Sequence, residues 1–286
     1  MYKIKFYSFL FLIGITFFSC SKENFEAQVP AYISIPSITL TTDYATQGST
    51  SSNIKDAWVF VNDDLVGVYE LPAKFPVLKE GNVTVKVFAG IKDNGITADG
   101  TKYLLYDPHV VQVNLVKNET VEIVATVSYA SSVKFSWLED FENVSLSFLH
   151  HSSSDTVIKN QSTIVKEGSG SGKIFLDDDM TFFEATSVPF TSVPLSGSPV
   201  YLEMDFITNE PVTVGIYLDA NQSAFITLNT TTVWKKIYIN LTNVINQNNS
   251  FNPSELRVFF GIRESSTPFL TSHPEIYLDN IKLIHF

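Results

Sequence analysis

Apolar side chains recur at every second position in much of the chain after residue 30, and this period most constrains the fold. Val83, Val85, Val87 and Ala89 show it clearly, with one other residue between each pair. Successive side chains of a β-strand point to opposite faces, so a period of two places one apolar face against a core. We find no apolar pattern of helical period that lasts longer than about two turns. The sequence therefore predicts an all-β protein.

The first half of the chain is predicted to form a small antiparallel sandwich over residues 31–130. Residues 57–61 and 65–71 are expected to pair as a hairpin, because a turn sequence of Asn and Asp separates them. A second hairpin is predicted between residues 110–115 and 121–127, on either side of another polar turn. Several short strands with turns between them are typical of a sandwich.

The segment 75–85 carries a resemblance to a known family. It follows the first hairpin and a Leu71-Pro72 step, and in it Gly81 precedes an alternating strand. This arrangement resembles the PEGA-type and related immunoglobulin-like domains of surface proteins. The resemblance implies an immunoglobulin-like β-sandwich that acts as a spacer or protein-contact module. Residues 90–108 are expected to form a long excursion from it.

Ala130-Ser131-Ser132 is expected to separate this sandwich from a second domain over residues 131–286. The second domain contains four short motifs in order: Phe135-Ser136-Trp137-Leu138-Glu139-Asp140-Phe141-Glu142-Asn143, Ser169-Gly170-Ser171-Gly172-Lys173, Trp234-Lys235-Lys236-Ile237-Tyr238-Ile239 and Ile276-Tyr277-Leu278-Asp279-Asn280-Ile281-Lys282-Leu283. Together they resemble the galactose-binding-like jelly roll of many carbohydrate-binding modules. The resemblance implies a β jelly-roll sandwich with a carbohydrate ligand.

Three predicted strands of the second domain, 200–207, 212–219 and 256–263, carry the candidate glycan-binding residues. Alternate apolar residues in each strand are expected to face the core, which leaves aromatic and charged residues on the other face. An aromatic ring can pack on the apolar face of a sugar while polar groups bind its hydroxyls. The candidates are Tyr201, Glu203, Asp205, Tyr217, Arg257, Phe259 and Arg263. The alternative is that these residues pair across strands and stabilise the sheet without a ligand.

The resemblance to the jelly roll also implies a cofactor, one structural calcium between the first and last strands. The matching positions are Asp140 or Glu142, and Asp279. Carboxylate oxygens are the ligands that calcium prefers. The alternative is that these carboxylates are polar strand ends with ordinary hydrogen bonds.

The first nineteen residues are typical of a signal peptide over residues 1–19. Lys3 and Lys5 precede an apolar run at 6–18 that is short for a membrane span. Ser19 then precedes Cys20, the only cysteine of the chain. A small residue before a cysteine at this place resembles the lipoprotein box of Bacteroidota, which implies cleavage there and acylation of Cys20 by palmitate-type chains. The alternative is an ordinary secretory peptide with an incidental cysteine.

Residues 20–30 are expected to be a lipidated tether. Its first part, residues 21–26, contains two glutamates and resembles the surface-export signal of Bacteroidota lipoproteins. Three acyl chains exceed the two signals that stable anchoring needs. We therefore expect an outer-membrane protein that is held by lipid and exposed at the cell surface.

Charge and motif content exclude several classes of function. The net charge of −11 argues against a nucleic-acid partner, because phosphate binding needs a basic surface. A single cysteine excludes an internal disulfide. The five histidines form no spaced metal motif, and the chain has no Gly-x-Ser-x-Gly elbow. We therefore expect no enzyme activity.

Asp155-Thr156-Val157 matches the short O-glycosylation motif of Bacteroidota proteins, which makes Thr156 a candidate glycosylation site. A chance match is the alternative, since the motif has only three positions.

These observations favour a non-catalytic outer-membrane lipoprotein that binds a polysaccharide or surface glycan through its second domain. The alternative is an accessory subunit or adhesin-like module of an outer-membrane protein complex, with a protein partner in place of a glycan. A glycoside hydrolase would need two carboxylates placed across a cleft.

Overall fold

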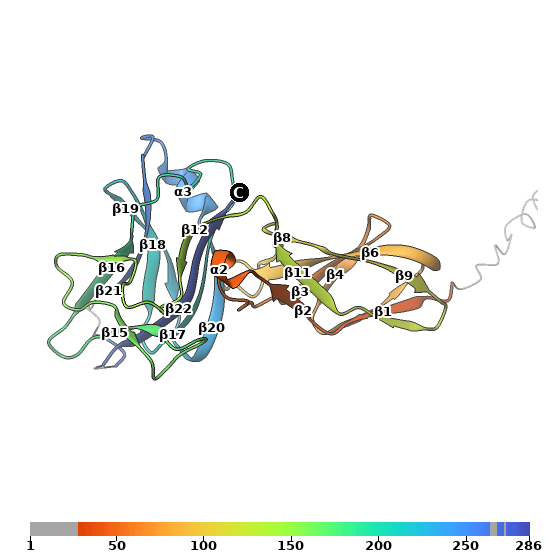
Figure 1. Ribbon diagram of the computed structural model, residues 1–286, viewed down its shortest axis with the longest axis horizontal. Coiled ribbons are helices and arrows are strands. Elements are labelled where there is room, and N and C mark those ends of the chain that lie inside the picture. Colours follow the sequence, from red (N-terminus) through yellow and green to blue (C-terminus); the bar gives the residue numbers. More distant parts are fainter. Residues whose placement is uncertain (1–27, 264–267, 272) are drawn as a thin grey trace, which may run out of the picture.

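Two β-sandwiches follow one another along the chain and lie end to end (Figure 1). The computed structural model describes residues 28–263, 268–271 and 273–286. Strand accounts for most of these residues and the two α-helices are short, which confirms the all-β prediction. No helix in the described part is both long enough and apolar enough to cross a membrane.

The first sandwich contains eleven strands and the short helix α2. They are β1 (Ala31–Ile35), β2 (Ile38–Thr41), α2 (Tyr44–Gln47), β3 (Asp56–Val61), β4 (Asp64–Glu70), β5 (Ala73–Val77), β6 (Gly81–Lys92), β7 (Gly100–Lys102), β8 (Tyr106–Asp107), β9 (His109–Leu115), β10 (Thr120–Glu122) and β11 (Ala125–Tyr129). One layer has the order β4-β3-β6-β7, with β9 also paired to β6. The other strands form two sheets, β10-β1-β5 and β2-β11-β8. The buried faces of these sheets share one apolar core.

The first predicted hairpin is confirmed, because β3 pairs antiparallel with β4. The second predicted hairpin is wrong. β9 pairs with β6, whereas β10 and β11 pair parallel with β1 and β2. Backbone hydrogen bonds explain the difference: the amide of Asn118 donates to Pro30 O at 2.9 Å, and the amide of Tyr32 donates to Glu119 O at 2.8 Å. The turn is thereby attached to β1. The chain passes from the sheet that contains β9 to the opposite layer, where β10 and β11 lie.

Among its described residues, the second sandwich contains the other eleven strands and the helix α3. They are β12 (Lys134–Glu139), β13 (Phe148–His150), β14 (Lys159–Gln161), β15 (Ser171–Phe175), β16 (Phe182–Ser187), β17 (Val200–Thr208), β18 (Val212–Leu218), β19 (Asn221–Leu228), β20 (Thr231–Asn240), α3 (Thr242–Asn248), β21 (Leu256–Arg263) and β22 (Glu275–His285). One sheet has the order β14-β15-β22-β17-β20, with β12 also on β22. The other has the order β13-β16-β21-β18-β19. We call the first the junction sheet, because the first sandwich packs on its outer face, and the second the open sheet.

The core between these two sheets follows the predicted alternation. Leu202 and Met204 of β17, Val214 of β18 and Phe260 of β21 are all fully buried in it. Alternation along each strand therefore identified the inward face correctly.

Glycines of the Ser169-to-Lys173 motif let the first loop of this sandwich pack closely. A Cβ on Gly170 would lie 2.2 Å from the carbonyl oxygen of Phe141, and a Cβ on Gly172 would lie 2.4 Å from the Phe141 ring. Phe141 is fully buried and joins the core. Because these glycines have no side chain, Phe141 can pack against the motif and hold the start of the domain in place.

The two sandwiches meet on the outer face of the junction sheet. Tyr201, Tyr238 and Ile284 of the second sandwich pack into the core cluster of the first. The amide of Asn94, just after β6, donates to Tyr238 O at 2.8 Å. β1 begins at the opposite end of the first sandwich, far from this junction (Figure 1).

Candidate functional site

Three of the seven predicted glycan-binding residues lie in the junction between the sandwiches. Glu203 and Asp205 of β17 have no exposed surface, and Tyr201 is 8% exposed. They do point away from the core of the second sandwich, as predicted, but the first sandwich covers them. The prediction that they line an open glycan surface is therefore wrong, because alternation identifies a face and says nothing about what packs on it.

Glu203 is the centre of a buried polar network. Its two carboxylate oxygens accept hydrogen bonds from Tyr103 at 2.7 Å and from Tyr129 at 3.0 Å, both residues of the first sandwich. The Nζ of Lys236 lies 3.6 Å from Glu203 Oε2. Burial, followed by the charge of Glu203, raises the pKa of Tyr103 and of Tyr129 well above the ordinary value. Both hydroxyls therefore remain protonated donors.

A second part of the network surrounds Asp205. Its carboxylate accepts from Ser51 Oγ at 2.9 Å and from Asn280 Nδ2 at 3.1 Å. Nearby, Lys282 Nζ donates to Ser49 O at 2.6 Å and to the Tyr129 hydroxyl at 3.2 Å. Burial lowers the pKa of Lys282 to about 8. The contacts with Ser51, Ser49 and Tyr129 cross the junction and hold the sandwiches in one arrangement.

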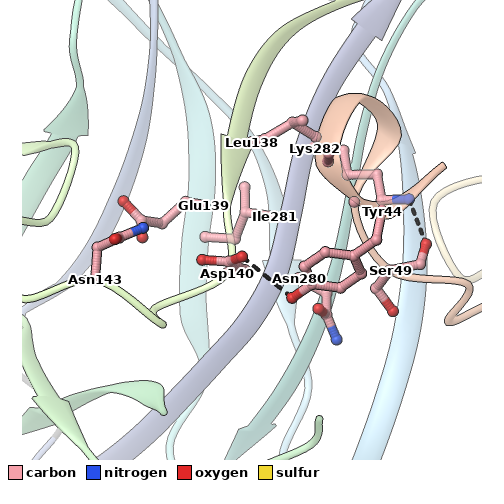
Figure 2. Close-up of a pocket in the computed structure, with 11 residues that line it drawn as sticks. Tyr44, Ser49, Leu138, Glu139, Asp140, Asn143, Asn280, Ile281 and Lys282 are labelled. Atoms are coloured by element: carbon pink, nitrogen blue, oxygen red, sulfur yellow. Dashed lines mark hydrogen bonds between the residues drawn. The ribbon is translucent and has the colours of Figure 1, made fainter. Parts of the chain in front are cut away.

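A groove of about 190 Å³ opens beside this network, between α2 and strands β12 and β22 (Figure 2). The hydroxyl of Tyr44 on α2 donates to Asp140 Oδ2 at 3.1 Å across the groove. Burial and the charge of Asp140 raise the pKa of Tyr44 to about 12. The two hydrogen bonds marked in Figure 2, from Tyr44 to Asp140 and from Lys282 to Ser49 O, both join the first sandwich to the second. We therefore regard the groove as part of the junction.

The other four predicted residues lie on the outer face of the open sheet, three of them in contact and Arg263 further along β21. The rings of Tyr217 on β18 and Phe259 on β21 form an edge-to-face pair with centroids 5.6 Å apart. The guanidinium carbon of Arg257 lies 5.2 Å from the centre of the Tyr217 ring. On the same strand, the guanidinium carbon of Arg263 lies 4.0 Å from the centre of the Phe182 ring. Tyr217 is half-buried and Arg263 is exposed, whereas Phe259 is only 3% exposed.

Glu184 and Gln222 complete this face and were missed by the sequence-based prediction. The hydroxyl of Tyr217 donates to Glu184 Oε1 at 2.7 Å, and Gln222 Nε2 donates to Glu184 Oε2 at 2.9 Å. Burial, followed by the contact with Glu184, raises the pKa of Tyr217 to about 12. The alternation of β16, Phe182 outside and Phe183 inside, would have placed Glu184 on this face.

Gly215 leaves room for the ring of Phe259. A Cβ on Gly215 would lie 2.5 Å from the Phe259 ring and 2.3 Å from Ser223 O. The ring therefore occupies the space that a side chain on β18 would need.

We define the open-sheet site by six residues: Phe182, Glu184, Tyr217, Gln222, Arg257 and Arg263. Tyr217, Glu184, Gln222 and Arg257 bring an aromatic ring, a carboxylate, an amide and a cation together, and Arg263 lies against Phe182 six residues further along β21. This mixture suits hydrogen bonding to hydroxyl groups over an apolar ring.

The predicted calcium ligands do not form a common site. Within the described ranges, no group of three or more His, Cys, Asp or Glu side chains could hold a metal ion. The hydroxyl of Ser169 donates to Glu142 Oε2 at 2.5 Å, and the amides of Ser169 and Gly170 donate to Glu142 Oε1 at 2.8 and 3.0 Å. These hydrogen bonds, first that of the hydroxyl, lower the pKa of Glu142. Asp279 Oδ2 accepts from the amide of Lys166 at 3.1 Å. Carboxylate oxygens that accept hydrogen bonds from N–H groups do not fit a cation at the same place. The calcium site therefore stays a prediction, and the geometry of Glu142 and Asp279 does not favour it.

Of the two predicted modification sites, Thr156 and Cys20, the structure describes only Thr156. Thr156 lies in the turn between β13 and β14, where Asp155 Oδ2 accepts from the amides of Thr181 and Phe182 at 2.9 Å each. Thr156 is half-exposed there, and its glycosylation stays a prediction. Cys20 lies outside the described residues.

Comparisons with known proteins return structural similarity only. No protein-family model matches the chain, and no curated protein matches its sequence significantly. The CBM22-1 xylan-binding domain from Paenibacillus barcinonensis Xyn10C is 9% identical over 55% of this chain and 97% of that domain, with a TM-score of 0.39. A family 29 carbohydrate-binding module in complex with mannohexaose is 11% identical over 54% and 91%, with a TM-score of 0.34. TmCBM61 in complex with β-1,4-galactotriose is 11% identical over 50% and 89%, with a TM-score of 0.31. Scores this low carry no inference about the ligand of this chain.

Proposed function

We propose that this chain is a non-catalytic, lipid-anchored surface protein whose second sandwich binds carbohydrate on the open-sheet site. One observation carries the proposal. The first sandwich covers the outer face of the junction sheet, whereas the open sheet lies on the side away from it (Figure 1). The open sheet is therefore the large face of this sandwich that a polysaccharide can reach.

The chemistry of the open-sheet site supports a sugar ligand. Glu184, Gln222 and Arg257 offer an acceptor, an amide and a donor within reach of the Tyr217 ring. Sugars are bound by such mixtures, because each hydroxyl both donates and accepts while the ring carbons pack on an aromatic surface.

The position of β1 in the first sandwich supports surface anchoring. β1 begins at the end of the first sandwich that is farthest from the second (Figure 1). A lipid on Cys20 would thus hold the second sandwich away from the membrane, with the first sandwich as a spacer.

Affinity electrophoresis against a panel of soluble polysaccharides tests the ligand. The two-domain chain beginning at Ser21 should be retarded by at least one of them, and Tyr217→Ala or Arg257→Ala should weaken the retardation at least fivefold. Tyr32→Ala is the matched control, because Tyr32 is a half-buried strand tyrosine of the first sandwich with Lys74 Nζ 5.5 Å from its ring centre. If no polysaccharide retards the chain, or if the control weakens binding equally, the proposed ligand or site is wrong.

The anchor has its own test. Cells that express the full chain and are fed labelled palmitate should label it in the membrane fraction, and Cys20→Ser should abolish both the label and the membrane association. A Cys20→Ser chain that remains in the membrane would mean that the anchor is not this lipid.

One observation favours the alternative, a protein partner in an outer-membrane complex. The outer face of the β4-β3-β6-β9 sheet carries Trp58, Phe60 and Phe88, with the last two rings 5.5 Å apart. Val68, which pairs with Trp58, is 46% exposed, and Val110, which pairs with Lys86 two residues before Phe88, is 53% exposed. If the chain co-purifies with a membrane barrel and Val68→Asp breaks that association while polysaccharide binding is absent, this alternative holds.

A further inference from the structure

A second cavity lies between the two sandwiches, and its lining is rich in lysine although the chain as a whole is acidic. It has a volume of about 340 Å³ and lies between β20 and the loop after β6. Ligand pockets generally measure roughly 300–1,000 Å³, so this cleft can hold part of a small ligand. Four lysines line it: Lys55, Lys92, Lys235 and Lys236.

The charge of this cleft is positive although the chain carries −11. Glu70 is the one carboxylate among the lining residues, which gives a lining charge of 4 − 1 = +3. Two neighbouring carboxylates reduce this: Asp56 Oδ2 lies 2.8 Å from Lys92 Nζ, and Glu203 Oε2 lies 3.6 Å from Lys236 Nζ. With both included the charge is +1. Lys55 and Lys235 are exposed, and neither makes an ion pair with any described residue.

Lys236 lies at the inner wall of the cleft, on the junction face of β20. Its side chain is 3% exposed, and its buried Nζ has no hydrogen-bond partner among the described residues. The Glu203 carboxylate lies 3.6 Å from this ammonium, so Lys236 acts on the cleft only through its charge and not by contact with a ligand. Lys55 and Lys235 are exposed, and a ligand with an anionic group fits their free ammonium groups.

The remaining walls suit a sugar better than a bare ion. Ile226 and Ile237 supply apolar surface, and Asn229 and Thr227 add exposed polar side chains. The walls come from both sandwiches, since Lys55 lies before β3 and Lys235 lies on β20. A bound ligand would therefore touch both domains.

We propose that this cleft binds an acidic saccharide, with its carboxylate or sulfate group held by the exposed lysines Lys55 and Lys235 and its ring against the two isoleucines. The site is separate from the open-sheet site and does not depend on it. A cleft between low-dielectric walls concentrates the field of its charges, which attracts anions and makes binding sensitive to salt.

Isothermal titration of the two-domain chain beginning at Ser21 tests the proposal with three probes: a galacturonate trimer, a neutral galactose trimer and inorganic sulfate. The acidic trimer should bind at least tenfold more tightly than the neutral trimer at 50 mM salt, and more weakly at 500 mM. Lys235→Ala and Lys55→Ala should each weaken it about fivefold or more. Lys134→Ala should leave it unchanged, because Lys134 is an exposed lysine at the start of β12, outside the cleft.

Three results would overturn the proposal. Equal affinity for the acidic and neutral trimers would remove the role of the anion. Sulfate that binds as tightly as the acidic trimer would remove the role of the sugar. Loss of the acidic trimer in Tyr217→Ala, with Lys235→Ala unchanged, would place the acidic ligand on the open sheet. Binding that requires Lys235 while all polysaccharides fail at Tyr217 would support the cleft and refute the open-sheet site.

Discussion

The hydroxyl of Tyr103 in the first sandwich donates a 2.7 Å hydrogen bond to Oε1 of Glu203 in the second. Tyr129 occupies the other carboxylate oxygen, and Lys236 lies beside it. Glu203 is fully buried, so its charge depends wholly on these neighbours for compensation. The relative position of the two sandwiches is therefore fixed by polar contacts as well as by apolar packing.

Removal of Glu203 should destabilise the chain strongly. Glu203→Ala leaves two buried tyrosine hydroxyls without their acceptor and the buried Lys236 ammonium without its ion-pair partner, which typically costs about 3–5 kcal/mol. Tyr103→Phe removes one hydrogen bond and should cost about 1–2 kcal/mol. Urea unfolding of the two-domain chain measures both, and small-angle scattering should show a broader range of domain separations for Glu203→Ala.

Glu80→Ala is the control for this prediction. Glu80 is 59% exposed and pairs with Lys117 at 3.2 Å, so its removal should change stability by less than about 1 kcal/mol. A Glu203→Ala chain as stable as Glu80→Ala, with unchanged scattering, would show that the network does not hold the junction.

The strand faces could be predicted from the sequence, and their surroundings could not. The alternation of Leu202 and Met204 with Glu203 correctly separated the two faces of β17. Burial of Glu203 depends on Tyr103, a hundred residues earlier, in the segment 90–108 that was expected to be a long excursion. Contacts of this kind arise from domain docking and leave no period in the sequence. The same reason explains why Tyr217 and Arg257, which lie on the sheet away from the junction, did come together as expected.

Stability should fall as the pH rises from about 4 to 7, owing to Asp279. Burial, with the nearby charge of Asp205 as a further cause, raises the pKa of Asp279 from 3.8 to about 7. In that range the unfolded chain has lost the proton while the folded chain keeps it, so ionisation favours unfolding. The effect should reach about 2–4 kcal/mol, at about 1.4 kcal/mol per pKa unit.

Asp279→Asn separates this effect from those of other titrating groups. Its amide oxygen can still accept from the amide of Lys166, and the side chain no longer ionises. Melting temperatures measured every half pH unit should fall less steeply for the variant than for the natural chain. Parallel curves would mean that Asp279 is not the group responsible.

Calcium should leave the melting temperature unchanged to within about 1 °C, because the oxygens of Glu142 and Asp279 face amide donors. A metal that binds only the folded state raises its stability with concentration, so a titration is sensitive to even weak binding. Scanning calorimetry with 5 mM calcium and with a chelator makes the comparison. A rise that Glu142→Gln abolishes would restore the metal site that the jelly-roll resemblance implies.

Gly172→Ala should destabilise the second sandwich by about 1–3 kcal/mol, the usual cost of overpacking a core. The new Cβ would lie 2.4 Å from the ring of Phe141, which is fully buried and cannot move without displacing its core neighbours. Gly261→Ala is the matched control, since its Cβ would lie 3.6 Å from the nearest atom, Phe183 O, and it also lies within a strand. Urea unfolding followed by tryptophan fluorescence should report the difference, because Trp137 packs in the same core. Equal midpoints for the two variants would mean that the first loop does not need the space which Gly172 leaves.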